Sequence, residues 1–195
     1  MMQRRSLLLT AIALAACSAE NPKPAFKNID ITGAAYAKAL SLPDADGKTR
    51  TLADFNGKVT IVFFGFAQCP DVCPSTLAEI AEVRQKLGAA GAKVQPVFIT
   101  VDPERDTAPV LKEYVRTFGE DVVALRGTLE QTQAAARDFK VFFGKVPGKT
   151  EGSYTIDHTA GSFVFDTKGQ VRLFVRYGGG ADALASDLKL LLENA

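Results

Sequence analysis

Donors for soft metals are scarce in this sequence. Its 195 residues contain three cysteines and one histidine. Because a fourth cysteine is absent, a four-thiolate iron–sulfur cluster is excluded. A closed structural zinc site needs four ligands. One cysteine, Cys17, belongs to a terminal signal segment, so two cysteines and the histidine leave such a zinc site one ligand short.

Charge of one sign is not concentrated anywhere in the chain. The formal net charge is +1, and no block of Lys or Arg stands out. Nothing therefore favours a nucleic-acid partner. The chain also has no internal repeat. With 47% hydrophobic and 23% charged residues, its composition is ordinary for a globular fold, and its length suits one domain with a proper core.

The first residues have the pattern of an export signal. Arg4 and Arg5 precede an apolar stretch at residues 6–14, which is too short to span a bilayer comfortably. Residues 14–17, Leu-Ala-Ala-Cys, resemble the bacterial lipobox, which implies cleavage before Cys17 and a lipid on its sulfur. A retained anchor helix and ordinary signal cleavage nearby are the alternatives. The paired arginines also resemble a twin-arginine signal, although such pairs are common in ordinary signals.

Export would place the folded part of the chain outside the cytoplasm. We expect a lipoprotein signal peptide at residues 1–16, a lipidated Cys17 and flexible tether at residues 17–34, and a folded domain at residues 35–195. The protein is then expected in the bacterial cell envelope, on the periplasmic side, anchored to the membrane by lipid. That compartment tends to oxidise the two remaining thiols.

The order of hydrophobic patterns predicts an α/β protein. Residues 39–42 and 49–52 flank a turn and predict an N-terminal β-hairpin. Two continuous apolar runs, at residues 59–64 and 94–101, predict central strands that are covered on both faces. The other predicted elements are a short helical turn at 52–58, helices at 74–87, 107–118, 129–139 and 181–192, a strand at 122–125 and a strand hairpin at 162–166 and 171–175. This order predicts a central sheet with helices on both faces.

Cys69 and Cys73 follow the first apolar strand and stand at the predicted start of a helix. If the residues around them are helical, the i,i+4 spacing places both sulfurs on one face. The N–H groups of a helix start favour thiolate over thiol. Two such thiolates can close a disulfide or bind a soft metal such as Cu(I) or zinc. Since Cu(I) accepts two or three soft ligands, copper suits this donor set.

The single histidine, His158, is predicted in a loop just before the strand at residues 162–166. In an α/β sheet of this kind, that loop can reach the edge where the strand at residues 59–64 ends. The alternative is a surface histidine without a role. Because the cysteine pair lacks a third ligand and the chain has no other histidine, we expect His158 to be that ligand.

Three separated segments resemble the signatures of the Sco/SenC family of copper proteins. They are residues 64–77, which contain both cysteines, residues 101–107 (Val-Asp-Pro-Glu-Arg-Asp-Thr) and residues 157–159 (Asp-His-Thr). The segments come in the family's order, and the resemblance spans residues 35–192. The chain departs from the family at Thr159, where serine is usual, and at residues 67–68 before the first cysteine. Neither departure removes a ligand.

The resemblance implies a thioredoxin-like fold with an inserted hairpin. It implies one copper ion, as Cu(I), Cu(II) or both, bound by Cys69, Cys73 and His158. It also implies a copper chaperone rather than an enzyme with turnover. Such a chaperone assists assembly of the dinuclear CuA centre in cytochrome c oxidase subunit II, or exchanges copper with another protein.

A thiol–disulfide oxidoreductase, which would reduce cysteines of a partner, is the main alternative. The Cys-x3-Cys spacing differs from the Cys-x-x-Cys of thioredoxins. A histidine also precedes the strand where thioredoxins resemble one another in carrying a proline. A peroxidase of the peroxiredoxin kind is disfavoured, because the Thr and Ser of that family's pattern do not precede either cysteine. Metal binding and redox chemistry are compatible, since copper needs the reduced thiols.

Other polar residues lie near these motifs. Asp71, between the two thiols, could tune their potential or contact a partner; the alternative is a solvated turn acid. Asp102, Arg105 and Asp106 are predicted to form an ion-pair network with a structural role in their loop.

Overall fold

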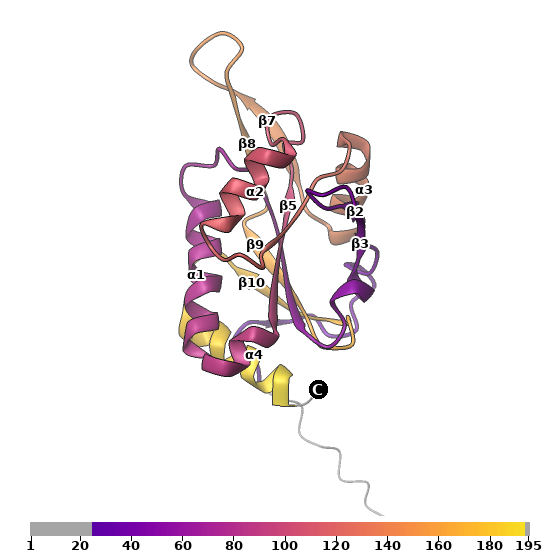
Figure 1. Ribbon diagram of the computed structural model, residues 1–195, viewed down its shortest axis with the longest axis vertical. Coiled ribbons are helices and arrows are strands. Elements are labelled where there is room, and N and C mark those ends of the chain that lie inside the picture. Colours follow the sequence, from indigo (N-terminus) through magenta and orange to yellow (C-terminus); the bar gives the residue numbers. More distant parts are fainter. Residues whose placement is uncertain (1–24, 194–195) are drawn as a thin grey trace, which may run out of the picture.

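A six-stranded mixed sheet forms the centre of the molecule in the computed structural model, which describes residues 25–193 (Figure 1). The strands run in the order β1-β10-β9-β4-β5-β6. Their bounds are Ile29–Asp30 for β1, Val59–Gly65 for β4, Val94–Thr100 for β5, Val123–Leu125 for β6, Gly161–Phe165 for β9 and Val171–Arg176 for β10. The predicted signal peptide and Cys17 lie outside the described residues.

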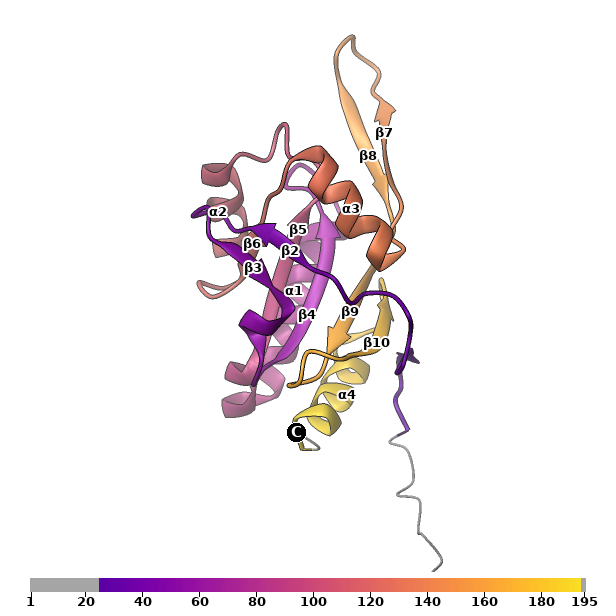
Figure 2. The same cartoon turned by 90° about the vertical axis from the view of Figure 1, so that its right-hand side faces the viewer.

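Layers cover both faces of this sheet, as the α/β pattern predicted. The α-helices of the described residues are α1 (Val72–Lys86), α2 (Ala108–Arg116), α3 (Leu129–Phe139) and α4 (Ala181–Glu193). α1, α2 and α4 lie on one face, and α3 lies on the other with the predicted N-terminal hairpin (Figures 1 and 2). That hairpin consists of β2 (Ser41–Pro43) and β3 (Thr49–Thr51). Between residues 25 and 193, no helix combines the length and apolar character that crossing a membrane requires.

The two central strands are buried from end to end. β4 pairs with β5 in parallel, from Val59 opposite Val94 to Gly65 opposite Thr100. Every residue of both strands is buried, because both faces of the sheet are covered. The continuous apolar runs predicted this. Both strands end at the same edge of the sheet, so the loops that follow them lie close together.

Aromatic side chains on β4 divide the core between the two faces of the sheet. Phe63 lies beside Phe98, with ring centroids 6.1 Å apart. Successive strand residues point to opposite faces, so Phe64 packs instead against Phe139 of α3, at 5.3 Å. The sheet face that carries Phe64 therefore packs against α3. On the opposite face, the ring of Phe63 lies beside that of His158, with centroids 5.9 Å apart.

A second hairpin, which the residue pattern did not predict, extends beyond the main sheet (Figure 2). Its strands, β7 (Phe143–Pro147) and β8 (Tyr154–His158), form a separate two-stranded sheet. His158 was predicted in a loop but is the last residue of β8. Ile156 is the buried residue of β8. The hairpin thus lacks the long apolar run that marked the central strands.

The fold begins earlier than the sequence pattern predicted. β1 pairs with β10 at the edge of the main sheet. Asp187 of α4 is fully buried and accepts hydrogen bonds from the backbone N–H groups of Lys27 and Asn28, at 2.9 and 2.8 Å. The predicted tether at residues 17–34 is therefore wrong for residues 25–34. A strand of two residues is too short to show a periodicity.

Candidate metal centre

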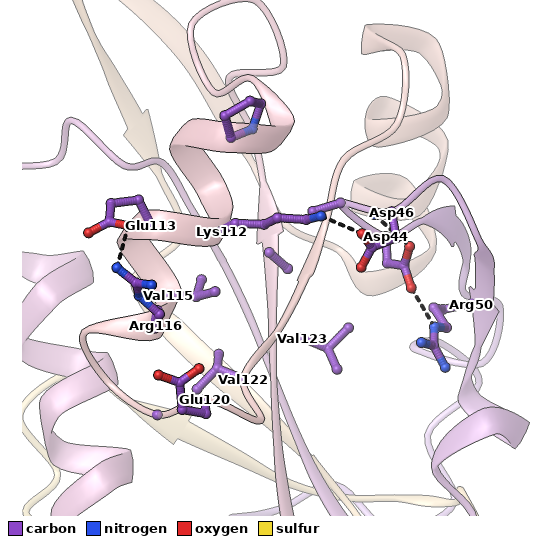
Figure 3. A pocket seen from close by; sticks show the side chains of 14 residues that line it. Asp44, Asp46, Arg50, Lys112, Glu113, Val115, Arg116, Glu120, Val122 and Val123 are labelled. Atoms are coloured by element: carbon purple, nitrogen blue, oxygen red, sulfur yellow. Dashed lines mark hydrogen bonds and ion pairs between the residues drawn. The ribbon is translucent and has the colours of Figure 1, made fainter.

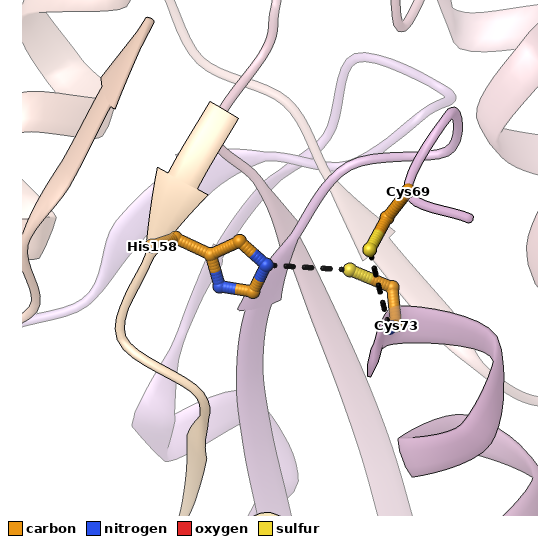
Figure 4. Close-up of side chains that lie close together, drawn as sticks. All are labelled: Cys69, Cys73 and His158. Atoms are coloured by element: carbon orange, nitrogen blue, oxygen red, sulfur yellow. Dashed lines mark hydrogen bonds between the residues drawn. The ribbon is translucent and has the colours of Figure 1, made fainter. Parts of the chain in front are cut away.

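Cys69 and Cys73 lie beyond the carboxyl end of β4, where the chain enters α1 (Figure 4). Cys73 is in the first turn of α1, but Cys69 precedes the helix, which begins at Val72. The condition for the i,i+4 placement, that the residues around both thiols are helical, is therefore not met at Cys69. The loop folds back instead, and the N–H of Cys73 points to Sγ of Cys69 at 3.5 Å. The sulfur thus accepts one of the N–H groups that a helix start leaves unpaired.

The structure brings His158 to the two thiols. Its Nε2 atom lies 3.5 Å from Sγ of Cys73. The ligand atoms of Cys69, Cys73 and His158 all lie within 4.8 Å of one another. Figure 4 shows the imidazole pointing from the end of β8 toward the sulfurs. Across residues 25–193, this is the one group of three or more Cys, His or carboxylate residues with spacing suited to a metal ion.

Neighbouring groups orient the ring of His158. The rings of Phe63 and Phe66 each meet it edge to face, with centroids 5.9 Å away. Nδ1 lies 3.2 Å from the backbone oxygen of Thr159. The tautomer with its hydrogen on Nδ1 donates to that oxygen and leaves the Nε2 lone pair facing Cys73. Burial lowers the pKa of His158, although the Thr159 hydrogen bond opposes the shift. The imidazole is therefore neutral at pH 7 and able to bind a metal.

Burial dominates the acid–base chemistry of Cys73. Both cysteines are free thiols; Cys69 is half-buried and Cys73 is buried. Burial raises the pKa of the Cys73 thiol, although a hydrogen bond with the backbone of Phe66 opposes the shift. The prediction that the helix start favours thiolate therefore fails for Cys73 when no cation is beside it. A metal ion compensates for burial, because it replaces the thiol proton and neutralises the thiolate.

The loop between β5 and α2 lies against the site. Arg105 forms the predicted ion pair with Asp102. Asp106 is buried. Its carboxylate accepts hydrogen bonds from the backbone N–H of Ala67 at 3.0 Å and from the hydroxyl of Thr100 at 2.6 Å. Its hydrogen-bond partners are therefore neutral donors, not the cation that was predicted.

Asp71 occupies the N-cap position of α1, where its side chain caps no backbone N–H. It is exposed, and its carboxylate accepts a hydrogen bond from the hydroxyl of Ser75 at 3.3 Å. This is the arrangement expected of the solvated turn acid.

A hollow lies between α2, β6 and the β2–β3 hairpin (Figure 3). Most of the charged side chains that line this hollow form ion pairs with one another. Neither a cysteine nor a histidine is among its lining residues. It therefore offers none of the donors found at the thiol site. The pairs are Asp44 with Arg50, Asp46 with Lys112 and Glu113 with Arg116.

Two contributors to the site were not singled out from the sequence. Phe66 lies within the motif at residues 64–77 but was given no role of its own, although its ring flanks His158. Tyr154 was not considered, although it begins the strand that His158 ends. The alternation of residues 154–158, Tyr-Thr-Ile-Asp-His, is the signal that could have indicated this strand.

Comparison with known proteins identifies close relatives. The family described as SCO1/SenC matches residues 30–193. The chain is 38% identical over 142 residues to a protein from Mus musculus named "Protein SCO2 homolog, mitochondrial", which covers 72% of this chain and 54% of the relative. It is 34% identical over 132 residues to a SCO2-like protein of Rickettsia felis, covering 67% of this chain and 64% of the relative. The chain thus spans about half the length of the first relative and less than two thirds of the second.

Solved structures share the fold as well. ScoI of Bradyrhizobium japonicum with copper bound is 38% identical, with a TM-score of 0.71 over 79% of this chain and 98% of that one. Apo Sco1 of Thermus thermophilus is 33% identical, with a TM-score of 0.75 over 88% and 100%. Yeast Sco1 with copper bound is 30% identical, with a TM-score of 0.72 over 80% and 88%.

Proposed function

Since the chain belongs to the SCO1/SenC family and has its thioredoxin-like fold, we propose that it binds one copper ion and delivers it during assembly of cytochrome c oxidase. Cys69, Cys73 and His158 are the proposed ligands. The observation that carries the proposal is the convergence of their three donor atoms within 4.8 Å. The acceptor is proposed to be the copper-binding region of oxidase subunit II or another copper-exchanging protein.

The donor set suits copper better than other metals. Two sulfurs and one imidazole nitrogen are soft or borderline ligands, and Cu(I) is satisfied by three of them. A structural zinc site takes four. The relatives from Bradyrhizobium japonicum and yeast were both solved with copper bound. The neutral imidazole and the reduced thiols are the protonation and redox states from which such a site is loaded.

The unequal exposure of the two thiols suggests how copper is exchanged. Cys73 is buried, whereas Cys69 is half-buried in the loop before α1. A thiolate of a partner can therefore approach on the Cys69 side and replace that ligand first. Release of the ligands then returns a proton to Cys73, whose pKa burial raises. The function is ligand exchange, so no catalytic turnover is proposed.

A thiol–disulfide role is the second candidate. The sulfur atoms of Cys69 and Cys73 lie within 4.8 Å of each other. Reduction of a partner disulfide would oxidise both thiols to a disulfide and transfer two electrons and two protons to the partner. That reaction needs no histidine ligand. Its dependence on His158 therefore separates it from copper delivery.

The lipid anchor on Cys17 and the periplasmic location are part of the same proposal. The lipobox-like residues 14–17 support them. The first described residues of the chain lie near α4, at the end of the molecule opposite the β7–β8 hairpin (Figure 2). Cys17→Ala should move the protein from the membrane fraction to the soluble fraction, and unchanged membrane retention would contradict the anchor.

An anaerobic titration of the reduced full chain with Cu(I), against a chromogenic competitor, tests the copper site. We expect one copper per chain and transfer to a purified subunit II fragment. Cys69→Ser, Cys73→Ser and His158→Ala should each weaken affinity by more than about 100-fold, because loss of a merely supporting residue costs 10–100-fold. Ser75→Ala, an exposed change in α1, serves as the control. Unchanged affinity in His158→Ala would remove the third ligand, and rapid disulfide reduction that survives this substitution would favour the second candidate.

A further inference from the structure

The loop between β5 and α2, residues 101–107, contacts both halves of the metal centre. We propose that Arg105 and Asp106 are positioning residues for copper: Arg105 holds the strand that carries His158, and Asp106 holds the loop that carries Cys69. This inference rests on the proposed copper site and assigns a role to residues that are not ligands.

The β7–β8 hairpin needs such a support. β8 pairs with β7 only and takes no part in the six-stranded sheet. The hydrogen bonds between Phe142 and Thr159, at 2.9 and 3.0 Å, close the base of the hairpin but join its two strands to each other. The chain after His158 continues into β9 at Gly161. The rest of β8, back to Tyr154, is held against the fold by side-chain contacts.

Arg105 makes the central contact to the hairpin. Its Nη1 donates to the backbone oxygen of Tyr154 at 2.9 Å. The guanidinium carbon lies 3.7 Å from the centroid of the Tyr154 ring, an arrangement typical of a cation–π contact. The Nε of Arg105 pairs with Oδ2 of Asp102, while the Tyr154 hydroxyl donates to Oδ1 of Asp102 at 3.0 Å. We call this closed set of Asp102, Arg105 and Tyr154 the Arg105 clasp.

The Arg105 clasp holds the face of β8 that also carries His158. Alternate residues of a strand share a face, so Tyr154, the buried Ile156 and His158 all point toward the body of the protein. The Arg105 clasp contacts Tyr154 at the start of this face, and His158, the proposed copper ligand, lies at its end. The Asp102 side chain is 1% exposed and that of Arg105 22%. A desolvated ion pair with a planar hydrogen-bonding fork fixes geometry more tightly than an exposed pair can.

Asp106 acts on the other half of the site. Its Oδ2 accepts the N–H of Ala67, two residues before Cys69, and the hydroxyl of Thr100 at the end of β5. Loss of this carboxylate would leave two donors without their partner, which is costly in a buried setting. Because Arg105 and Asp106 are adjacent, one short loop sets the position of the histidine relative to the cysteines.

A double-mutant cycle for Cu(I) affinity tests this division of roles in the full chain. Arg105→Ala should lower affinity about 10–100-fold, as loss of a residue that orients a ligand does. In a His158→Ala background it should have little further effect, because its influence passes through His158. Asp106→Ala should lower affinity in both backgrounds, because its influence passes through the cysteine loop. Tyr154→Phe keeps the stacked ring but loses the hydroxyl, so it should be intermediate.

The Cu(II) form supplies a readout that general destabilisation would not move. Nitrogen hyperfine coupling from His158 should weaken in Arg105→Ala and persist in Asp106→Ala. Arg172→Ala is the matched control: Arg172 is also 22% exposed, pairs with Asp166 at 3.1 Å and lies over a ring, that of Phe26. It should change stability without changing affinity. Equal losses from Arg105→Ala with and without His158 would overturn the proposal, whereas unchanged affinity in His158→Ala alone would overturn the copper site itself.

Discussion

The Nε2 atom of His158 lies 3.5 Å from Sγ of Cys73, although 85 positions separate the two residues in the chain. One atom belongs to a strand outside the main sheet and the other to the first turn of a helix. Two edge-to-face phenylalanine rings and one backbone oxygen fix the imidazole in this direction. The contact therefore joins two parts of the fold that share no backbone hydrogen bonds.

The titration of His158 should report its burial. Burial lowers its pKa from 6.5, with the Thr159 hydrogen bond opposing. The folded pKa is thus below the unfolded one, so the stability gained by keeping the ring neutral is complete above pH 6.5 and is lost as pH falls through the folded pKa. With a single histidine in the chain, an NMR titration is unambiguous, and a midpoint at or above 6.5 would contradict the prediction. Urea unfolding of metal-free His158→Ala should lack this part of the pH dependence.

Gly65→Ala should disturb the thiol site by crowding the sulfur of Cys73. A Cβ at this position would stand 2.7 Å from Sγ of Cys73 and 2.9 Å from atoms of Phe63 and Phe98. We expect a loss of about 1–3 kcal/mol in the free energy of unfolding, as for other overpacked cores, together with weaker copper binding. Gly144→Ala is the control, because its Cβ would meet nothing closer than 3.4 Å. Wild-type copper affinity in Gly65→Ala would show that Cys73 tolerates the displacement.

Two phenylalanines three positions apart should differ sharply in their effect on stability. Phe139 is fully buried and contacts Phe64 and Phe163. Phe139→Ala should cost about 3–5 kcal/mol in denaturant unfolding. Phe142 is 67% exposed, so Phe142→Ala should change stability by no more than about 0.5 kcal/mol. Similar costs for the two variants would mean that Phe142 is covered in solution.

Asp187→Ala should loosen the first strand. Its carboxylate accepts the N–H groups of Lys27 and Asn28 and the side-chain amide of Asn28. Removing it should cost about 1–3 kcal/mol and should speed hydrogen exchange and proteolysis at residues 27–30. Asp182→Ala, on the same helix but with a side chain 90% exposed, is the control. Unaltered exchange at residues 27–30 would show that β1 is held by its pairing with β10.

The central elements of the fold were predictable because their signals are local. The runs that became β4 and β5 are apolar at nearly every position, since both faces are covered. The periodicity of α3 predicted its bounds, Leu129–Phe139, without error. Weak local signals led to the errors. β8 alternates, but it carries only one buried residue, Ile156, so its signal is short and weak. β1 has two residues in all, which is too few to show a periodicity.

The three candidate ligands followed from residue chemistry and the family resemblance, but their surroundings did not. Nothing local in the sequence indicated that α1 would begin at Val72 and include Cys73, or that burial would outweigh the helix start at Cys73. Both depend on how the loop folds against other segments. The prediction that Asp106 joins an ion pair failed for the same reason, because its donors, Ala67 and Thr100, come from other parts of the chain.

The sequence by itself determined the chemistry that is available: two cysteines in Cys-x3-Cys spacing and one histidine leave a soft, three-donor set. It also determined the buried strands, because their apolar character is carried by the residues themselves. Only the tertiary structure decided that the three donors meet. Their meeting depends on contacts such as that between Arg105 and Tyr154, whose partners are far apart in the chain, and no local periodicity specifies such a contact.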